Sequence, residues 1–237
     1  MGAAFIGGLF GCVLLMNLAI PPLVTTRPSM YREIDAGFYQ PESWSIATSL
    51  IELPWIAVLL LAYSSIVYFM IGLEPSQFGF FYATVFLLGT VFTFLGHTLA
   101  AVSNSQQIAT AIATVLMGVQ ALFAGFLVPG PNMADGWIWL HYLVPLRYGL
   151  GGLMSTPFYC SDTSGDLPAG EPGPCATVSV IDNGRLVPGK LKADFVDDFF
   201  GFKFEDIEFY LGMLAMYIVV LVGVKMLANR FIRHQSR

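Results

Sequence analysis

Five long runs of apolar residues, separated by shorter polar segments, dominate the sequence. Each run reaches the roughly 20 apolar helical residues that cross about 30 Å of hydrocarbon, where lipid offers the backbone no hydrogen-bond partners. The pattern therefore predicts an all-α, polytopic bundle of about five transmembrane helices. The expected spans are at about residues 2–24, 47–73, 78–102, 108–128 and 207–228.

Composition supports the membrane class. Hydrophobic residues make up 56% of the chain and charged residues 11%, and the mean hydropathy is +0.68. A soluble domain of this length cannot bury so much apolar surface.

The basic residues predict the orientation, because cytoplasmic flanks of spans are enriched in Lys and Arg. Lys225, Arg230, Arg233 and Arg237 follow or end the last span, so the C-terminal tail is expected in the cytoplasm. Counting spans backwards leaves Met1 outside, and no signal-peptide pattern begins the chain. We therefore expect a further span upstream. The chain divides into residues 1–128 with four spans, an exoplasmic region 129–206, and a last span with its basic tail at 207–237.

Two segments between the spans are unusual. Residues 27–42 mix charges with aromatic side chains, which favours a helix at the cytoplasmic membrane surface. It is either an interfacial anchor or a docking element. Around residues 129–154, an aromatic cluster interrupted by Pro145 and several glycines predicts a broken or re-entrant helix pair in the outer interface.

The remaining candidate chemistry is sparse. Cys160 and Cys175, both in the exoplasmic loop, are expected to form a disulfide in an oxidising compartment, with two free thiols as the alternative. No further Cys or His lies nearby at ligand spacing, so no metal site is expected. Glu52 is interpreted as structural rather than proton-coupling, and His97 as a hydrogen-bonded packing residue rather than a proton relay.

Five short motifs, in this order along the chain, resemble the membrane half of the G subfamily of ABC transporters. This subfamily includes the pleiotropic drug resistance type and has an ABC-2 type membrane domain. The motifs are M-Y-R-E-I-D-A-G-F-Y (30–39), I-E-L-P (51–54), I-V-Y-F-M-I-G-L (66–73), A-G-F-L-V (124–128) and W-I-W-L-H-Y-L-V-P-L-R-Y-G-L (137–150). A cysteine-bearing outer loop and a basic-tailed last span follow. The family half has six spans, so this chain resembles spans two to six, without span one and without the nucleotide-binding domain.

The resemblance implies the permease part of an ATP-driven exporter that moves lipophilic or amphipathic compounds, drugs or lipids from the cytoplasmic leaflet. The chain has no G-x-x-x-x-G-K-[ST] loop and no catalytic residues, so ATP and Mg²⁺ would belong to an associated nucleotide-binding domain. The expected partners are that domain, a second transmembrane half, a lipophilic substrate and membrane lipid, with no nucleic acid. The expected location is the plasma membrane.

The resemblance also assigns residues to roles. A coupling role falls on the cytoplasmic segment, which is similar to the family's connecting helix. The substrate path would run between the family's second and fifth spans, and a hydrophobic gate would lie above it. The coupling residues are Tyr31, Arg32 and Glu33; the path residues are Phe10, Gly11, Leu14, Leu15, Thr114, Met117, Gly118, Ala121 and Leu122; the gate residues are Phe126 and Leu127.

Two other classes of function compete with this interpretation. An ion-coupled secondary transporter would need intramembrane charges in several spans and internal repeats, which the sequence lacks. A non-transporting membrane scaffold is disfavoured by the broken outer helices and the glycine-bearing spans.

Overall fold

The computed structural model describes residues 2–71, 75–128, 133, 136–155, 177–182, 185–191, 202 and 206–232. For residues 2–6, 8–10, 71, 76 and both strands, only the course of the backbone is described. The predicted disulfide between Cys160 and Cys175 lies outside the described residues, as does most of the loop that contains it.

Long helices make up the fold, as the sequence predicts. The elements are α1 (Gly2–Asp35), α2 (Pro41–Ile71), the 3₁₀ turn η1 (Pro75–Gln77), α3 (Phe78–Val102), α4 (Gln106–Phe123), α5 (Ile138–Leu143), α6 (Pro145–Ser155), β1 (Thr177–Asp182), β2 (Arg185–Leu191) and α8 (Ile207–Phe231). The strands β1 and β2 pair antiparallel as a hairpin, with Thr177 opposite Leu191 and Asp182 opposite Arg185.

Four helices in the described part of the chain are long and apolar enough to cross a membrane, namely α2, α3, α4 and α8. The predicted span 78–102 coincides with α3, whereas α4 ends at Phe123, five residues before the predicted boundary. The remaining expected span falls in α1, most of whose first ten side chains are not described.

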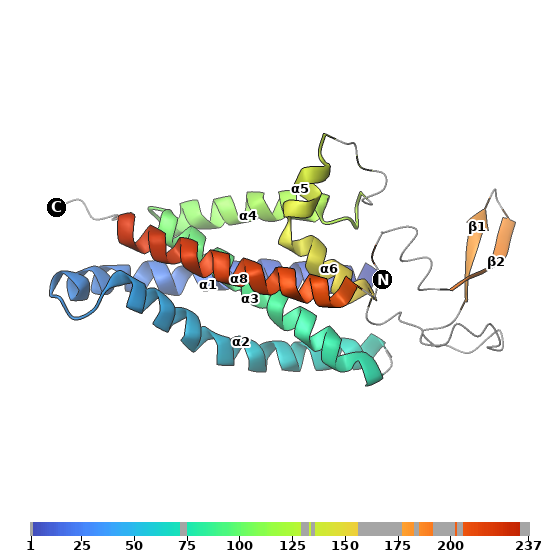
Figure 1. Ribbon diagram of the computed structural model, residues 1–237, viewed down its shortest axis with the longest axis horizontal. Coiled ribbons are helices and arrows are strands. Elements are labelled where there is room, and N and C mark those ends of the chain that lie inside the picture. Colours follow the sequence, from blue (N-terminus) through green and yellow to red (C-terminus); the bar gives the residue numbers. More distant parts are fainter. Residues whose placement is uncertain are drawn as a thin grey trace.

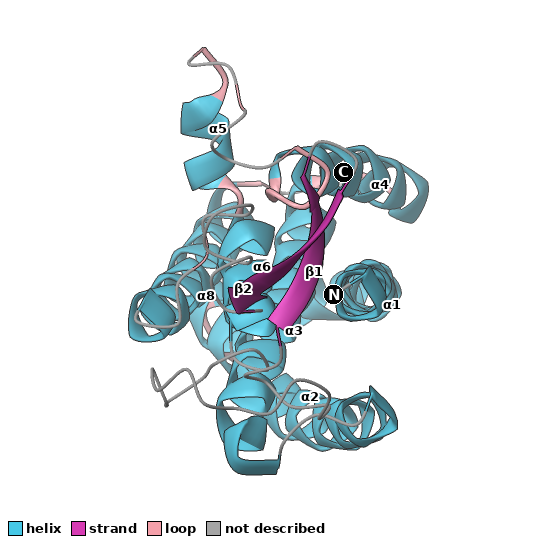
Figure 2. Cartoon of the chain, turned by 90° about the vertical axis from the view of Figure 1, so that its right-hand side faces the viewer, coloured by secondary structure: helices cyan, strands magenta, loops and turns pink. Residues whose placement is uncertain are grey.

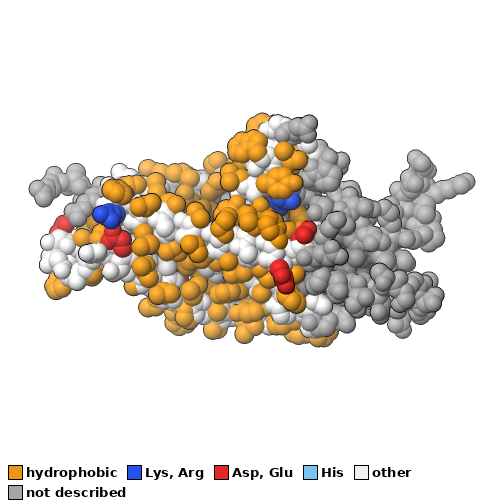
Figure 3. Space-filling view, in the orientation of Figure 1, with side chains coloured by type: hydrophobic (Ala, Val, Ile, Leu, Met, Phe, Trp, Pro, Cys, Tyr) orange, Lys and Arg blue, Asp and Glu red, His pale blue; other side chains and the backbone are white. Residues whose placement is uncertain are grey.

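The helix α3 is the centre of the bundle (Figure 1) and packs against α1, α2, α4, α6 and α8. Seen from the end, the other long helices surround it (Figure 2). Its buried side chains include Leu88, Val91 and Phe92, which pack with Met16 of α1 and Tyr68 of α2. The outward surfaces of the long helices are mostly hydrophobic along the length of the bundle (Figure 3), as lipid contact requires.

The two ends of the bundle differ in chemistry. The α1–α2 connection, the α3–α4 connection and the end of α8 lie together at one end, which we call the basic end because Arg27, Arg32 and Arg230 belong to it (Figure 1). The short helices α5 and α6 lie at the other end, which we call the α5–α6 end.

The connection between α1 and α2 is a sharp bend rather than one surface helix across residues 27–42. The helix α1 continues to Asp35 and stops because Gly37 adopts φ +79°, a conformation that glycine tolerates best. Gly37 N–H donates to the Ile34 carbonyl at 3.0 Å and Phe38 N–H donates to the Glu33 carbonyl at 3.1 Å, which is the Schellman pattern of a helix end. Pro41 then begins α2. We call residues 31–42 the elbow.

Close contact between α1 and α3 depends on Gly96. A Cβ atom at this position would lie 2.5 Å from the backbone carbonyl oxygen of Met16, and backbone cannot move aside as a flexible side chain can. The two helices approach closely because residue 96 has no side chain.

Replacing Gly96 by Ala should therefore lower the free energy of unfolding by about 1–3 kcal/mol, because the helices must separate. The matched control is Gly79→Ala on the same helix, where nothing lies within 4 Å of the added Cβ. Thermal unfolding of the purified full-length protein would measure both. Equal unfolding temperatures for the two variants would contradict the close contact.

Candidate functional site

The predicted path residues of α1 do not share one environment. Leu14 is 59% exposed, whereas Leu15 is half-buried and packs against the core. Gly11 is also half-buried, and the Phe10 side chain is outside the described residues. Of the three positions whose side chains are described, Leu14 is the exposed one.

The predicted residues of α4 separate in the same way. Thr114, Gly118 and Leu122 follow one another at four-residue spacing and are all exposed, Leu122 at 52%. Met117 is only 4% exposed and belongs to the core, while Ala121 is half-buried. A helical repeat of 3.6 residues explains the split, since positions four apart share a face and Met117 points elsewhere.

The exposed faces of α1 and α4 lie at a similar depth. Arg27 of α1 contacts Ser103 at the end of α3, just before α4 begins at Gln106. Leu14 lies 13 residues from Arg27, and Gly118 lies 12 residues from Gln106. At about 1.5 Å per residue, each is about 20 Å from the basic end. The helices α1 and α4 also pack against each other. We call Leu14, Thr114, Gly118 and Leu122 the α1–α4 face.

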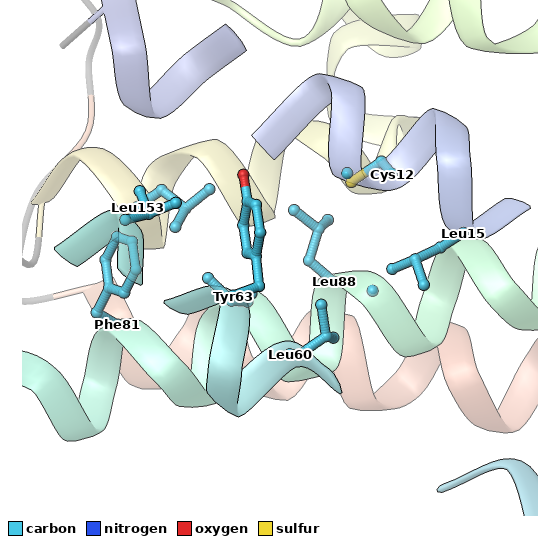
Figure 4. A pocket seen from close by; sticks show the side chains of 11 residues that line it. Cys12, Leu15, Leu60, Tyr63, Phe81, Leu88 and Leu153 are labelled. Atoms are coloured by element: carbon cyan, nitrogen blue, oxygen red, sulfur yellow. The ribbon is translucent and has the colours of Figure 1, made fainter. Parts of the chain in front are cut away.

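A small apolar pocket lies on the inner side of α1 (Figure 4), between α1, α2, α3 and α6. Leu15, Leu60, Tyr63, Leu88 and Leu153 contribute to its lining, as does Gly11. Its volume is about 30 Å³. Sites for drug-sized ligands measure about 300–1,000 Å³, so this pocket is too small to hold such a compound in the conformation described.

The predicted gate follows a tight turn at the end of α4. Gly125 has φ +100° and redirects the chain directly after the helix. Phe126 is half-buried and packs against the core, whereas Leu127 is exposed. The two gate residues therefore face different surroundings.

The three predicted coupling residues lie where α1 ends. Arg32 and Glu33 are exposed, whereas Tyr31 is buried. Tyr39 donates a hydrogen bond from its hydroxyl to Glu33 Oε2 at 2.6 Å, which closes the elbow. Burial, this hydrogen bond and the Glu33 charge raise the pKa of Tyr39 to about 12, so its phenol remains a donor at neutral pH.

Arg27, one helical turn before the elbow, joins α1 to α3, a role that the sequence did not indicate. Its guanidinium donates from Nη1 to the Ser103 carbonyl at 3.0 Å and from Nη2 to the Ala100 carbonyl. The last carbonyls of a helix have no partner within the helix, and Arg27 supplies one. Arg27 therefore attaches α1 to the end of α3.

A buried lysine joins α2, α3 and α8. Lys225 has no exposed surface, and its Nζ donates to Thr48 Oγ1 at 2.8 Å and to Ser49 Oγ at 3.1 Å. His97 Nδ1 of α3 lies 3.4 Å from the same Nζ. Glu52, on the same helix as Thr48, forms no ion pair within the described residues.

The helices α2 and α8 make further polar contacts toward the basic end. Asn229 Nδ2 donates to Ser45 Oγ at 2.9 Å, and Arg230 forms an ion pair with Glu42 at 3.0 Å. We call this series the α2–α8 polar ladder, which comprises Glu42, Ser45, Thr48 and Ser49 on α2 and Lys225, Asn229 and Arg230 on α8. It begins at Glu42, the last residue of the elbow.

The ladder predicts an asymmetric response to mutation. Thr48 and Ser49 also donate to backbone carbonyls of their own helix, so they keep partners when Lys225 is replaced by Met. The combined change Thr48→Val and Ser49→Ala instead removes both hydroxyl acceptors of the buried Lys225 ammonium. This loss should lower the free energy of unfolding by about 3 kcal/mol. Adding Lys225→Met to that pair should restore most of the loss.

Unfolding temperatures of these three variants of the full-length protein test the ladder. If Lys225→Met is as damaging as the double substitution and gives no rescue, Lys225 is not held by the two hydroxyls.

At the α5–α6 end the predicted broken helix pair is present. Val144 is extended, with φ −83° and ψ 118°, because Pro145 disfavours a helical residue before it. Tyr148 O–H donates to the Tyr142 carbonyl across the break, and Tyr217 O–H of α8 donates to the Leu143 carbonyl, both at 2.7 Å. These bonds satisfy carbonyls that the break leaves free.

His141 connects α5 to the end of α4. Its Nδ1 lies 2.7 Å from the Phe123 carbonyl oxygen, so the Nδ1–H tautomer donates this bond. Burial lowers the pKa of His141, the bond to Phe123 opposes that shift, and the nearby Arg147 charge lowers it further. His141 is therefore neutral at physiological pH. Among the described residues, no group of three His, Cys, Asp or Glu side chains could hold a metal ion.

Comparison with known proteins is consistent with this architecture. Residues 1–158 match the family described as ABC-2 type transporter. The chain is 31% identical over 221 residues to ABC transporter G family member 40 of Arabidopsis thaliana, covering 90% of this chain and 14% of that protein. It is 28% identical over 239 residues to Pleiotropic drug resistance protein 1 of Nicotiana tabacum, covering 100% of this chain and 15% of that protein.

The matched region is thus about one seventh of the length of these relatives. The motifs that resemble the G subfamily fall within it, and the helical bundle agrees with a membrane domain. The chain belongs to the ABC-2 type transporter family and corresponds to the membrane half of its G-subfamily ABC transporters.

Proposed function

We propose that this chain is the permease portion of an ATP-driven exporter, and that the α1–α4 face carries lipophilic or amphipathic compounds, drugs or lipids, out of the cytoplasmic leaflet. The observation that carries the proposal is the exposure of Leu14, Thr114, Gly118 and Leu122 at similar depth on two helices that pack together. The relationship to ABC-2 type transporters supports a role in transport.

The composition of this face suits a substrate that binds by shape and area. It combines leucines with a threonine and a glycine, so it offers apolar contact, one hydroxyl and one position without a side chain. The exposed side chains of α2 are larger and more uniformly apolar, including Trp55, Leu59 and Phe69, as suits lipid contact. Apolar contact contributes roughly 25 cal/mol per Å² and discriminates weakly between compounds of similar shape.

A second transmembrane half would cover the α1–α4 face and complete the path between the two halves. Phe126 and Leu127 follow α4 directly, so they would form the gate at the α5–α6 end of that path. The small volume of the pocket behind α1 supports a path outside this single chain rather than within it.

A nucleotide-binding domain, with its ATP and Mg²⁺, would dock at the elbow. Arg32 and Glu33 are exposed there and offer a charged surface to such a partner. Two connections lead into the bundle near the elbow, namely Arg27, one turn before it, to the end of α3, and the polar ladder from α2 to α8. Movement of the elbow would thereby reach the helices behind the α1–α4 face.

Truncation of the α1–α4 face should change the substrate spectrum. In Leu14→Ala and Leu122→Ala, each transported compound should lose affinity in proportion to the area that it covers there, up to about tenfold for a well-buried contact. Basal ATP turnover should change little. Leu59→Ala is the matched control, since Leu59 is 55% exposed on α2, outside the proposed path.

The measurement is transport of several dyes and lipids by the full-length protein, with ATPase activity, each normalised to surface expression. Selective losses in the Leu14 and Leu122 variants alone support the path. Uniform loss that tracks poor expression, or equal effects from Leu59→Ala, would show that these side chains only face lipid or pack.

Reversing the charge at Glu33 should uncouple ATP hydrolysis from transport. Glu33→Lys removes both the negative charge and its hydrogen bond with Tyr39, whereas Tyr39→Phe removes only the hydrogen bond. We expect several-fold less transport per ATP hydrolysed in Glu33→Lys and near-normal coupling in Tyr39→Phe.

The ratio of transport to ATP hydrolysis in reconstituted vesicles measures this effect. Similar ratios in the two variants would mean that Glu33 acts only within the elbow, through Tyr39, and has no role toward a partner domain.

A further inference from the structure

The helix α5 presents an unusually apolar surface beyond the end of α4. Trp139, Tyr142 and Leu143 are each more than half exposed, and Trp137 just before them is equally so. In Figure 3 this hydrophobic surface projects from the side of the bundle at the α5–α6 end. Trp and Tyr are enriched where a bilayer meets water, so α5 is suited to lie at headgroup depth.

Arg147 lies directly behind this surface. It is the single Lys or Arg in α5 and α6. Its guanidinium carbon is 4.1 Å from the centre of the Tyr142 ring and 5.5 Å from that of Tyr148, so two aromatic faces support one side of the cation. Stacking of this kind leaves the N–H groups at the guanidinium edge available to an anion.

Arg147 has no anionic partner in the described part of the chain. It forms no ion pair and no side-chain hydrogen bond there, and its buried Nε atom lacks a partner. The helix α8 begins at the same end of the bundle (Figure 1), and its exposed acids Asp206 and Glu208 form no ion pair with Arg147. His141 is neutral, because burial lowers its pKa, so it does not offer a second positive charge to an anion at this site.

Three hydrogen bonds hold α5, and with it the Tyr142 ring, in place beside Arg147. Tyr148 holds the Tyr142 carbonyl, Tyr217 of α8 holds the Leu143 carbonyl, and His141 holds the end of α4. The aromatic support of the cation is therefore preorganised, which lowers the ordering cost that a ligand would meet.

We propose that Arg147 binds the phosphate of a membrane phospholipid. Its guanidinium matches a phosphate oxygen pair, and the exposed side chains of Trp139, Tyr142 and Leu143 contact the glycerol and upper acyl chains. The site is separate from the α1–α4 face, and it stands whether or not that face carries substrate. It binds a lipid that stays in place and stabilises the α5–α6 end.

The test uses the purified, delipidated full-length protein in detergent. Thermal stability is titrated with dioleoyl phosphatidylglycerol, with dioleoyl phosphatidylcholine, with dioleoylglycerol, which has the same acyl chains but no phosphate, and with inorganic phosphate. Both phospholipids should raise the unfolding temperature at lower concentrations than dioleoylglycerol, and inorganic phosphate at similar concentrations should have no effect.

Arg147→Gln should weaken the phospholipid response about tenfold or more, because a charge-assisted pair of hydrogen bonds is lost. Arg147→Lys should retain an intermediate response, since charge remains without the planar fork. Arg230→Gln, an exposed arginine at the basic end, is the matched control and should respond as the unmodified protein does.

Three outcomes would overturn the proposal. These are an equal response to dioleoylglycerol, a response to inorganic phosphate that matches that to phospholipid, and an unchanged phospholipid response in Arg147→Gln. If Arg147→Gln does not fold, the lipid comparison on the unmodified protein and the Arg147→Lys variant decide the question.

Discussion

Polar groups within hydrocarbon need partners from the protein itself, and this constraint organises the bundle. Lys225 shows its effect most clearly, because an ammonium without exposed surface is stable only where several acceptors converge. Thr48, Ser49 and His97 supply them from two other helices. The position of α8 against α2 and α3 is thereby specified by polar contacts, in addition to apolar packing that many arrangements would satisfy.

The same constraint distinguishes helices that are joined by polar contacts from a helix that packs mainly through apolar side chains. Polar contacts join α2, α3 and α8, and Arg27 attaches the end of α1 to the end of α3. The buried side chains described in α4 are instead mostly small or apolar, such as Ala109, Ala113 and Met117, with Gln120 as the polar exception. His141 of α5 bonds to the Phe123 carbonyl at the end of this helix. The proposed path at the α1–α4 face would require α4 to move against the body formed by α2, α3 and α8.

Much of the fold could be predicted from the sequence, because apolar length alone determines which segments can span a bilayer. The span at 78–102 and the break at Pro145 follow directly from residue types. The bend at Gly37 was not predicted, although a glycine after a charged helical run is a recognisable stop signal. The end of α4 at Phe123 was also missed, since the apolar run continues beyond the turn at Gly125.

The site was less predictable, because its contacts join residues far apart in the chain. Lys225 and Thr48 are separated by 177 positions, and Arg27 and Ser103 by 76, so no local pattern indicates either contact. The prediction from sequence placed Met117 and Gly118 together on the path. Consecutive positions of a helix point in different directions, and Met117 is buried in the core. The assignments of path, gate and coupling remain predictions until transport is measured.

The most direct measurement is photoaffinity labelling of the full-length transporter with a transported lipophilic compound that bears a diazirine, followed by peptide mapping. The account predicts labels on the segments around Leu14 and around Thr114 to Leu122, reduced by an excess of unmodified compound. Labels distributed equally over the exposed surfaces of α2 and α8, with no such competition, would contradict it.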